Sequence, residues 1–221
     1  MGPEAIVFDM DGTLTDTEET WDVVRRGLAA EAGLPWPDGS TQAMMGMSTQ
    51  EWSDHLVSVV GLPMTPEEAA RRTIEGMAAA YRGGVTLLPG AVDAVRRMAE
   101  RYPVAIASSS PRLLIETGIE VMGLADVIRA SVSTEECERG KPAPDGYLKA
   151  CELLGVDPGR SVAVEDATNG IRSALAAGMA VVAVPPHFHP PSADLLARTT
   201  VLETLDELTH ELVEGLVTAS S

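Results

Sequence analysis

Short apolar runs that stop at polar residues recur along the chain. Four of them are continuously apolar apart from one leading serine, as in strands buried on both faces, and lack the alternation of a half-exposed strand. These runs cover residues 5–8, 104–107, 161–164 and 180–184, and residues 127–132 form a weaker candidate. The pattern predicts a sheet made of buried, parallel strands.

Helix-like segments lie between these runs. Ser110 followed by Pro111 predicts an N-cap and a first helical residue, and Gly123 is placed to end that helix. Two later segments stop in the same way, at Gly155 and Gly178. Strands that alternate with helices indicate an α/β fold with a doubly wound parallel sheet.

The strand pattern disappears between residues 17 and 83. Apolar residues recur there at helical spacing, and capping-box sequences begin at Ser48 and Thr65. We therefore predict an all-helical domain, residues 17–83, inserted after the first strand. Residues 1–16 and 84–221 would together form the α/β core.

Composition narrows the classes of protein to which the chain can belong. The 221 residues are 45% hydrophobic and 22% charged, as in an ordinary globular protein. A net charge of −17 disfavours binding to nucleic acid or to an anionic membrane. Two cysteines make no disulfide framework. The sequence shows no recognisable signal peptide and no apolar stretch long enough to span a bilayer, so we expect a cytoplasmic protein. We also expect it to be a monomer.

Polar residues stand at the ends of three predicted strands. Asp9 and Asp11 follow the first, Ser108 follows the second, and Glu165 and Asp166 follow another. In an open parallel sheet, ligands bind beyond the carboxyl ends of the strands. Any one of these residues alone would most simply be a turn former or a helix cap. Together, they predict a polar site at one edge of the sheet.

The residue types at this edge favour phosphoryl transfer. Clustered carboxylates repel one another unless a hard cation lies among them, and Mg²⁺ is the usual one. A carboxylate can also act as a nucleophile and form an aspartyl phosphate. Lys141 precedes a predicted helix and can reach the same edge. A metal ion and a lysine would together offset the charge of a transferring phosphoryl group.

The ordered motifs resemble those of the haloacid dehalogenase superfamily of phosphohydrolases. The resemblance covers nearly the whole chain, and it extends to the position of the helical insert. The four matching segments begin with the sequence Val7-Phe8-Asp9-Met10-Asp11-Gly12-Thr13-Leu14 and continue with Ala107-Ser108, Lys141-Pro142-Ala143-Pro144-Asp145 and Val164-Glu165-Asp166 with Asn169-Gly170.

The resemblance implies a role for each acid. Asp9 would attack the substrate phosphorus, while Asp11 would protonate the leaving alcohol and later deprotonate the hydrolytic water. Mg²⁺ would be held by Asp9, the backbone carbonyl of Asp11, and Asp166, with Glu165 helping through water. Asp11 also argues against the dehalogenase branch, which lacks this second acid and the metal.

The same resemblance implies the residues that hold the phosphoryl group. Ser108 and Lys141 would bind its oxygens and act in catalysis. Thr13 and Ser109 lie beside them in the motifs and are expected to bind substrate.

The insert resembles the small helical cap of the subgroup that contains β-phosphoglucomutase and 2-deoxyglucose-6-phosphatase-like enzymes. The β-phosphoglucomutases have a histidine and a basic pair where this chain has Trp21, Met45 and Thr49. The loss of these groups favours hydrolysis over isomerisation. We expect these three residues to bind substrate, and the run Met44–Met47 either lines the site or packs inside the cap.

The sequence thus predicts a Mg²⁺-dependent phosphatase that acts on a small phosphorylated metabolite, such as a sugar or polyol phosphate. Two alternatives remain. One is an isomerase of the β-phosphoglucomutase kind. The other is a phospho-acceptor module, although receiver domains are shorter and accept the phosphoryl group on a later strand.

Overall fold

The computed structural model describes residues 2–44, 47–187 and 190–218. The chain forms two compact units, which we call the core (residues 1–16 and 86–221) and the cap (residues 17–85).

The core is built on one parallel sheet of six strands, in the order β3-β2-β1-β4-β5-β6. This confirms the predicted doubly wound α/β fold, including the weak strand candidate at residues 127–132. The last strand was not predicted, because its two residues are too few to show a pattern. The strands are β1 (Ala5–Phe8), β2 (Val104–Ser108), β3 (Ile128–Ser133), β4 (Ser161–Glu165), β5 (Ala180–Ala183) and β6 (Thr200–Val201).

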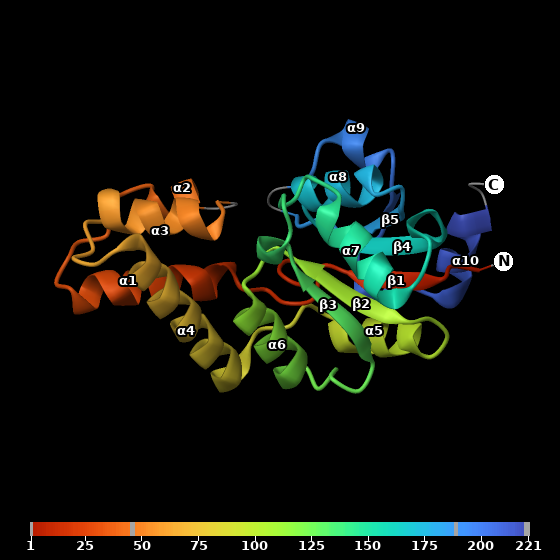
Figure 1. Ribbon diagram of the computed structural model, residues 1–221, viewed down its shortest axis with the longest axis horizontal. Helices are drawn as coiled ribbons and strands as arrows, with labels where there is room; N and C mark the ends of the chain where they lie inside the picture. The colour runs from red at the N-terminus through yellow and green to blue at the C-terminus, as the bar shows by residue number, and fades with distance from the viewer. Residues whose placement is uncertain (1, 45–46, 188–189, 219–221) are drawn as a thin grey trace. The chain divides into compact units, whose positions relative to one another are not determined.

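Helices cover both faces of this sheet, with α7 and α8 on one face and α5 and α6 on the other (Figure 1). The core helices are α5 (Ala91–Ala99), α6 (Arg112–Val121), α7 (Asp145–Leu154), α8 (Thr168–Ala176), α9 (Ala193–Leu196) and α10 (His210–Thr218). In the described part of the chain, three short 3₁₀ helices accompany them: η1 (Thr134–Glu136), η2 (Pro158–Arg160) and η3 (Leu205–Glu207).

The position of β1 at the centre of the sheet explains why its sequence is continuously apolar. All four of its residues are fully buried, and it pairs with β2 on one side and β4 on the other. Phe8 lies opposite Ile106 and Val164, so the carboxyl ends of the three strands coincide. A strand covered by helices on both faces has no side on which a polar residue is favoured.

The predicted start of the helix after β2 was wrong by one residue. Pro111 is the N-cap and α6 begins at Arg112. Ser110 does not cap this helix; its hydroxyl donates a hydrogen bond to the Asp11 carboxylate. Proline at the cap costs no hydrogen bond, because the first backbone N–H groups of a helix have no intrahelical acceptor.

The cap consists of α1 (Glu18–Glu31), α2 (Ser40–Met44), α3 (Thr49–Ser58) and α4 (Pro66–Gly84). The capping box at Ser48 is complete, because Ser48 and Glu51 each accept a bond from the other's backbone N–H. At Thr65 the hydroxyl accepts from the backbone N–H of Glu68, whose carboxylate is bound by Arg71.

The cap has its own apolar core, in which Leu56 and Ala69 are fully buried and Trp52 nearly so. Met44 belongs to this core and Met47 packs against it. Of the two expectations for this methionine run, cap packing is therefore confirmed for Met44 and Met47.

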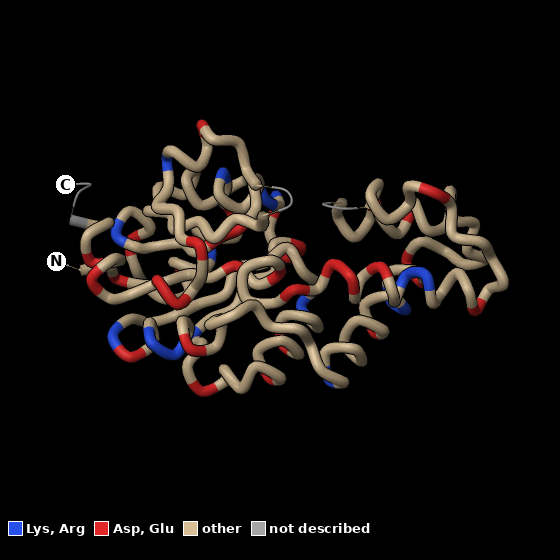
Figure 2. Tube along the Cα trace, turned by 180° about the vertical axis from the view of Figure 1, so that it is seen from behind, with Lys and Arg blue, Asp and Glu red and all other residues tan. Residues whose placement is uncertain are grey.

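Charge is spread over both units, with basic residues occurring singly or in short pairs among acidic ones (Figure 2). Within the described ranges, no helix combines the length and the apolar character that crossing a membrane requires. Cys137 and Cys151 are free thiols.

Candidate active site

Three carboxylates gather where β1 and β4 end. Asp9 directly follows β1, Glu165 ends β4, and Asp166 comes next. Their exposed fractions are only 6%, 1% and 7%, respectively. One oxygen from each lies within 4.8 Å of the others. The backbone N–H of Asp9 donates to the carbonyl of Val164 at 2.9 Å, which joins the two strand ends.

Lys141 supplies a positive charge to this cluster. Its Nζ lies 2.5 Å from Asp9 Oδ1 and 2.6 Å from Glu165 Oε1, and its side chain is nearly buried. Burial alone would lower the pKa of Lys141, but the attraction of Asp9 and Glu165 raises it above its usual value. The lysine is therefore charged at neutral pH, in contact with the two carboxylates.

Tyr147 is a further member of the site that sequence reasoning missed. This fully buried residue of α7 donates its hydroxyl to Glu165 Oε1 at 2.7 Å, and Lys141 Nζ lies 5.1 Å from its ring centroid. The other Glu165 oxygen accepts the backbone N–H of Asp166 at 3.1 Å. Tyr147 thus holds Glu165 in place. Its position two residues after Asp145 could have suggested it, but an aromatic residue on a helix is more often simple packing.

Two glycines leave room for the carboxylates. Gly12 has a φ of +89°, and a Cβ there would overlap the Asp166 carboxylate. Gly170 is on α8, and a Cβ there would overlap the Glu165 carboxylate. Helix α8 and the loop after β1 can approach the acids this closely only because Gly170 and Gly12 lack a side chain.

We expect Gly170→Ala to destabilise the protein by about 1–3 kcal/mol, because the new methyl group must displace the buried Glu165 carboxylate. Urea unfolding would measure this loss, and activity should fall with it. Gly27→Ala is the matched control, since Gly27 lies exposed on α1 with open space around its Cα. That change should stabilise the cap helix by up to about 1 kcal/mol. Equal effects of the two substitutions would contradict this role of Gly170.

The electrostatics of the cluster favour a cation. Burial raises the pKa of Asp9 well above its usual value, and Glu165 and Asp166 add to the shift while Lys141 opposes it. Burial, followed by the charge of Glu165, raises the pKa of Asp166 to about 7. Three acids share one lysine, and their oxygen donors are the type that Mg²⁺ prefers. The residues therefore fit a divalent metal ion.

Asp11, the fourth acid predicted for the site, is held by two hydroxyl groups. Thr15 donates to Asp11 Oδ1 at 3.3 Å and Ser110 donates to Oδ2, so both of its oxygens are bound. The Asp11 side chain is not part of the three-carboxylate group. Thr15 and Ser110 were not predicted as site residues, although they lie close in sequence to Asp11 and Ser108.

The serines at the end of β2, Ser108 and Ser109, and Thr13 in the loop after β1 are also held by hydrogen bonds. Ser108 Oγ accepts the backbone N–H of Ser110 at 3.1 Å. Ser109 Oγ accepts a bond from Thr134 at 3.4 Å. The buried Thr13 donates to Asp166 Oδ1 at 3.2 Å.

The predicted substrate residues of the cap have different surroundings. Trp21 is half-buried, packs against the cap core, and its ring centroid lies 5.8 Å from that of Trp52. Thr49 is the first residue of α3 and is half-buried. Met45 lies outside the described residues.

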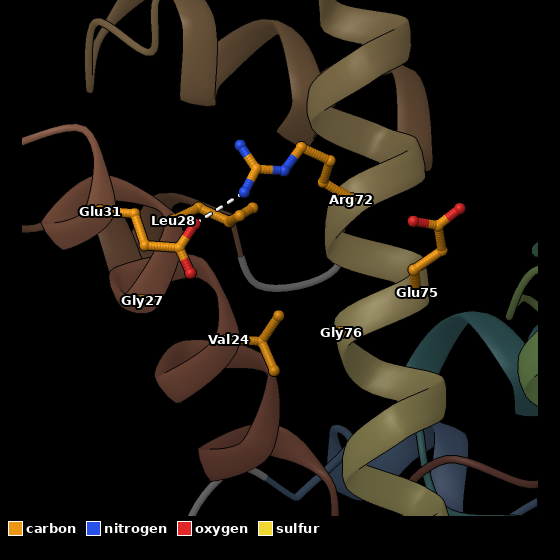
Figure 3. A pocket seen from close by; sticks show the side chains of 7 residues that line it. All are labelled: Val24, Gly27, Leu28, Glu31, Arg72, Glu75 and Gly76. Carbon is orange, nitrogen blue, oxygen red and sulfur yellow. Dashed lines mark hydrogen bonds and ion pairs between the residues drawn. The ribbon is translucent and has the colours of Figure 1, made fainter.

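A cavity of about 400 Å³ lies elsewhere, in the cap between α1 and α4 (Figure 3). Val24 and Leu28 line it, and Glu31 and Arg72 pair across it at 2.6 Å. The other acid in its lining, Glu75, pairs with the exposed Arg71 at 2.7 Å. The clustered carboxylates and Lys141 belong to the core, and they make up the candidate active site.

Comparison with known proteins gives a matching family and several named relatives. A family model described as haloacid dehalogenase-like hydrolase matches residues 3–178. Fructose-1-phosphate phosphatase YqaB from Escherichia coli is 32% identical over 179 residues, covering 81% of this chain and 95% of that protein. Hexitol phosphatase A from Escherichia coli is 32% identical over 222 residues, covering 97% and 94%.

Solved structures show the same fold. The crystal structure of CbbY from Rhodobacter sphaeroides in complex with phosphate matches with a TM-score of 0.79 and 26% identity, covering 93% of this chain and 96% of that one. A β-phosphoglucomutase from Clostridium difficile has a TM-score of 0.78 over 98% of each chain. At 20% identity, this second likeness concerns the fold alone.

Proposed function

The chain belongs to the haloacid dehalogenase-like hydrolase family, and from that premise we propose that it is a Mg²⁺-dependent phosphatase of a small sugar or polyol phosphate. Both the family and its phosphatase relatives make it a phosphoric monoester hydrolase. The observation that carries the proposal is the buried cluster of Asp9, Glu165 and Asp166, with Lys141 bonded to Asp9. Such a cluster provides a nucleophile, metal ligands and a cation in one place.

Asp9 is the nucleophile in this proposal. One of its carboxylate oxygens attacks phosphorus, the bond from phosphorus to the alcohol oxygen breaks, and an aspartyl phosphate forms. Lys141 and Ser108 hold the oxygens of the transferring group, because negative charge spreads over them in the transition state. Asp9, Asp166, the Asp11 carbonyl and, through water, Glu165 would hold Mg²⁺, which would supply further charge stabilisation.

Asp11 moves the proton in both steps. As an acid it protonates the departing alcohol oxygen, and as a base it takes a proton from the water that attacks the aspartyl phosphate. Inorganic phosphate then leaves and the Asp9 carboxylate is restored. The hydrogen bonds from Thr15 and Ser110 orient the Asp11 carboxylate for these proton transfers. Asp11 is half-buried, whereas the three clustered acids are buried.

Relatives support the choice of substrate class. The two curated relatives described above are named for fructose 1-phosphate and hexitol substrates. Fructose and the hexitols are both polyhydroxylated carbon chains. We propose the same class for this chain.

A panel of sugar phosphates, polyol phosphates, nucleotides and phosphoglycolate, assayed with and without Mg²⁺, tests the proposal. We expect phosphate release in the presence of Mg²⁺, fastest with a sugar or polyol phosphate, and almost none with a chelator. Accumulation of glucose 6-phosphate from β-glucose 1-phosphate without free phosphate would instead indicate an isomerase. A long-lived aspartyl phosphate without turnover would indicate a phospho-acceptor module.

Mg²⁺ should bind more tightly as the pH rises from about 5.5 to about 8, because Asp166, with its pKa raised to about 7, must lose a proton before binding a cation. A raised pKa in the folded state also means that the metal-free protein loses stability as the pH rises through 7. At a hundred times its Kd, Mg²⁺ adds about 2.7 kcal/mol. Thermal unfolding with and without Mg²⁺ at the two pH values measures both effects.

Asp166→Asn is the control for this pH effect, because it removes the titrating group while keeping its size. The variant should show a much smaller gain from Mg²⁺ at high pH. A gain from Mg²⁺ that is the same at both pH values in the unmodified protein would contradict the prediction.

A further inference from the structure

Glu165 is the carboxylate of the site whose hydrogen-bonding positions are all filled. Its Oε1 accepts the Tyr147 hydroxyl at 2.7 Å and lies 2.6 Å from Lys141 Nζ. Its Oε2 accepts the backbone N–H groups of Asp166 at 3.1 Å and Ala167 at 3.4 Å. A carboxylate offers about four acceptor positions. An ion would therefore have to displace one of these donors before it could bind Glu165 directly.

The other two acids of the cluster are less occupied. Asp9 accepts a hydrogen bond from Lys141 through Oδ1, and among the described residues its Oδ2 accepts none. Within the same ranges, Asp166 accepts one side-chain hydrogen bond, from Thr13 to Oδ1 at 3.2 Å. Asp9 and Asp166 therefore have acceptor positions to offer an ion. Glu165 has none to spare, although it belongs to the same group of three carboxylates.

The Glu165 side chain is also confined by its neighbours. It is nearly inaccessible to solvent, and Gly170 on α8 lies so close that a Cβ there would overlap the carboxylate. Two of the four donors to Glu165 are side chains. Lys141 also binds Asp9, whereas the hydroxyl of the fully buried Tyr147 binds Glu165. Tyr147 is therefore the side chain whose polar group serves to fix this carboxylate.

Charge alone does not decide which divalent ion such a site prefers. When ionised, the three acids carry three negative charges against one positive charge on Lys141, which leaves two for an ion to cancel. Mg²⁺ and Ca²⁺ would cancel them equally. The two ions differ in coordination, because Mg²⁺ requires a near-ideal octahedron with few carboxylates, whereas Ca²⁺ accepts more oxygens in a looser arrangement. The number of carboxylates that are free to move onto the ion is therefore what separates them.

We propose that Tyr147 is a positioning residue that keeps Glu165 from binding the ion directly and thereby favours Mg²⁺ over Ca²⁺. With Glu165 held by Tyr147, only Asp9 and Asp166 have carboxylate oxygens to offer, and this low ligand number suits Mg²⁺. Groups that orient the residues around a metal commonly change its affinity by about 10–100-fold. The proposal rests on the metal-dependent function proposed above and adds to it the residue that selects the ion.

Tyr147→Phe removes the hydroxyl and keeps the ring, whose centroid lies 5.1 Å from Lys141 Nζ. Glu165 Oε1 keeps its contact with Lys141, so no buried acceptor is left unpaired and the variant should fold. Isothermal titration calorimetry measures the Kd for Mg²⁺ and for Ca²⁺ without substrate. We expect the affinity of the variant for Ca²⁺ to rise about tenfold and its affinity for Mg²⁺ to change by less than about threefold.

Tyr102→Phe is the matched control. Tyr102 also donates its hydroxyl to a glutamate, Glu214 at 3.0 Å, but it precedes β2 and so lies at the opposite end of that strand from Ser108. This change should leave the ratio of the two affinities unaltered. A second variant adds Glu165→Gln to Tyr147→Phe. It should abolish the gain in Ca²⁺ affinity, because the carboxylate that was freed to bind the ion is then gone.

Three results would overturn the proposal. One is a Tyr147→Phe protein in which the two affinities change by the same factor or not at all, as a purely structural role predicts. Another is a gain in Ca²⁺ affinity that survives Glu165→Gln. The third needs no variant: an unmodified protein that binds Ca²⁺ more tightly than Mg²⁺, or binds neither. Phosphate release by the unmodified protein decides the phosphatase proposal separately, because the titrations contain no substrate.

Discussion

Replacing Asp9 by asparagine should lower the turnover of p-nitrophenyl phosphate by about a thousandfold or more. An amide oxygen is a poor nucleophile and carries no charge to bind Mg²⁺ or Lys141. The side chains have the same shape, so the contacts of the strand end can persist. The rate of phosphate release, measured with saturating Mg²⁺, gives the size of the effect.

The fold should survive this substitution. Burial already raises the pKa of Asp9, so a neutral side chain is well tolerated there. Removal of one of three buried acids also reduces their mutual repulsion, and the metal-free variant should be at least as stable as the unmodified protein at neutral pH. Asp194→Asn, at an exposed acid of α9, is the matched control and should keep full activity. Substantial activity in a folded Asp9→Asn protein would exclude Asp9 as the nucleophile.

Replacing Lys141 by methionine should cost the metal-free protein about 3–5 kcal/mol, because it leaves buried carboxylates without their cation. Methionine fills much the same space, so the loss reports charge more than packing. Turnover should fall by about a hundredfold or more as the phosphoryl group loses a positive contact. Urea unfolding measures the first effect, and phosphate release measures the second.

The chain offers a close control for this change. Lys149 lies on α7 and pairs with Glu152 at 2.9 Å, with both side chains about half or more exposed. Lys149→Met should therefore change stability by less than about 0.5 kcal/mol.

Combining the two active-site changes tests their coupling. Asp9→Asn in the Lys141→Met background should recover part of the lost stability, since it removes one of the unpaired charges. Strictly additive effects would show that Lys141 and Asp9 do not interact as their 2.5 Å contact implies.

The core fold could be read from the sequence because its signals are local. A strand buried on both faces must be continuously apolar, and β1 shows this over residues 5–8, β2 over residues 104–107 and β4 over residues 162–164. Glycine after a helix is equally local, as at Gly155, whose φ is +70°. Strand β6 carries no such signal, because only two residues pair.

Local signals were misleading where a side chain had a distant partner. Ser110 before Pro111 has the pattern of a helix cap, yet its hydroxyl binds Asp11, 99 residues away. Tyr147 has the pattern of ordinary packing on α7, yet its hydroxyl binds Glu165. Neither partner is visible from the spacing of neighbouring residues.

The sequence by itself determined which chemical groups stand at the ends of which strands, because strand ends and helix caps depend on neighbouring residues. Only the tertiary structure decided how these groups interact. It places Lys141 against Asp9, 132 residues away, and buries the acids so deeply that the pKa of Asp166 rises to about 7. It also places the buried Arg25 between the rings of Trp21 and Trp52. Burial and pairing depend on distances in space, and distances along the chain do not specify them.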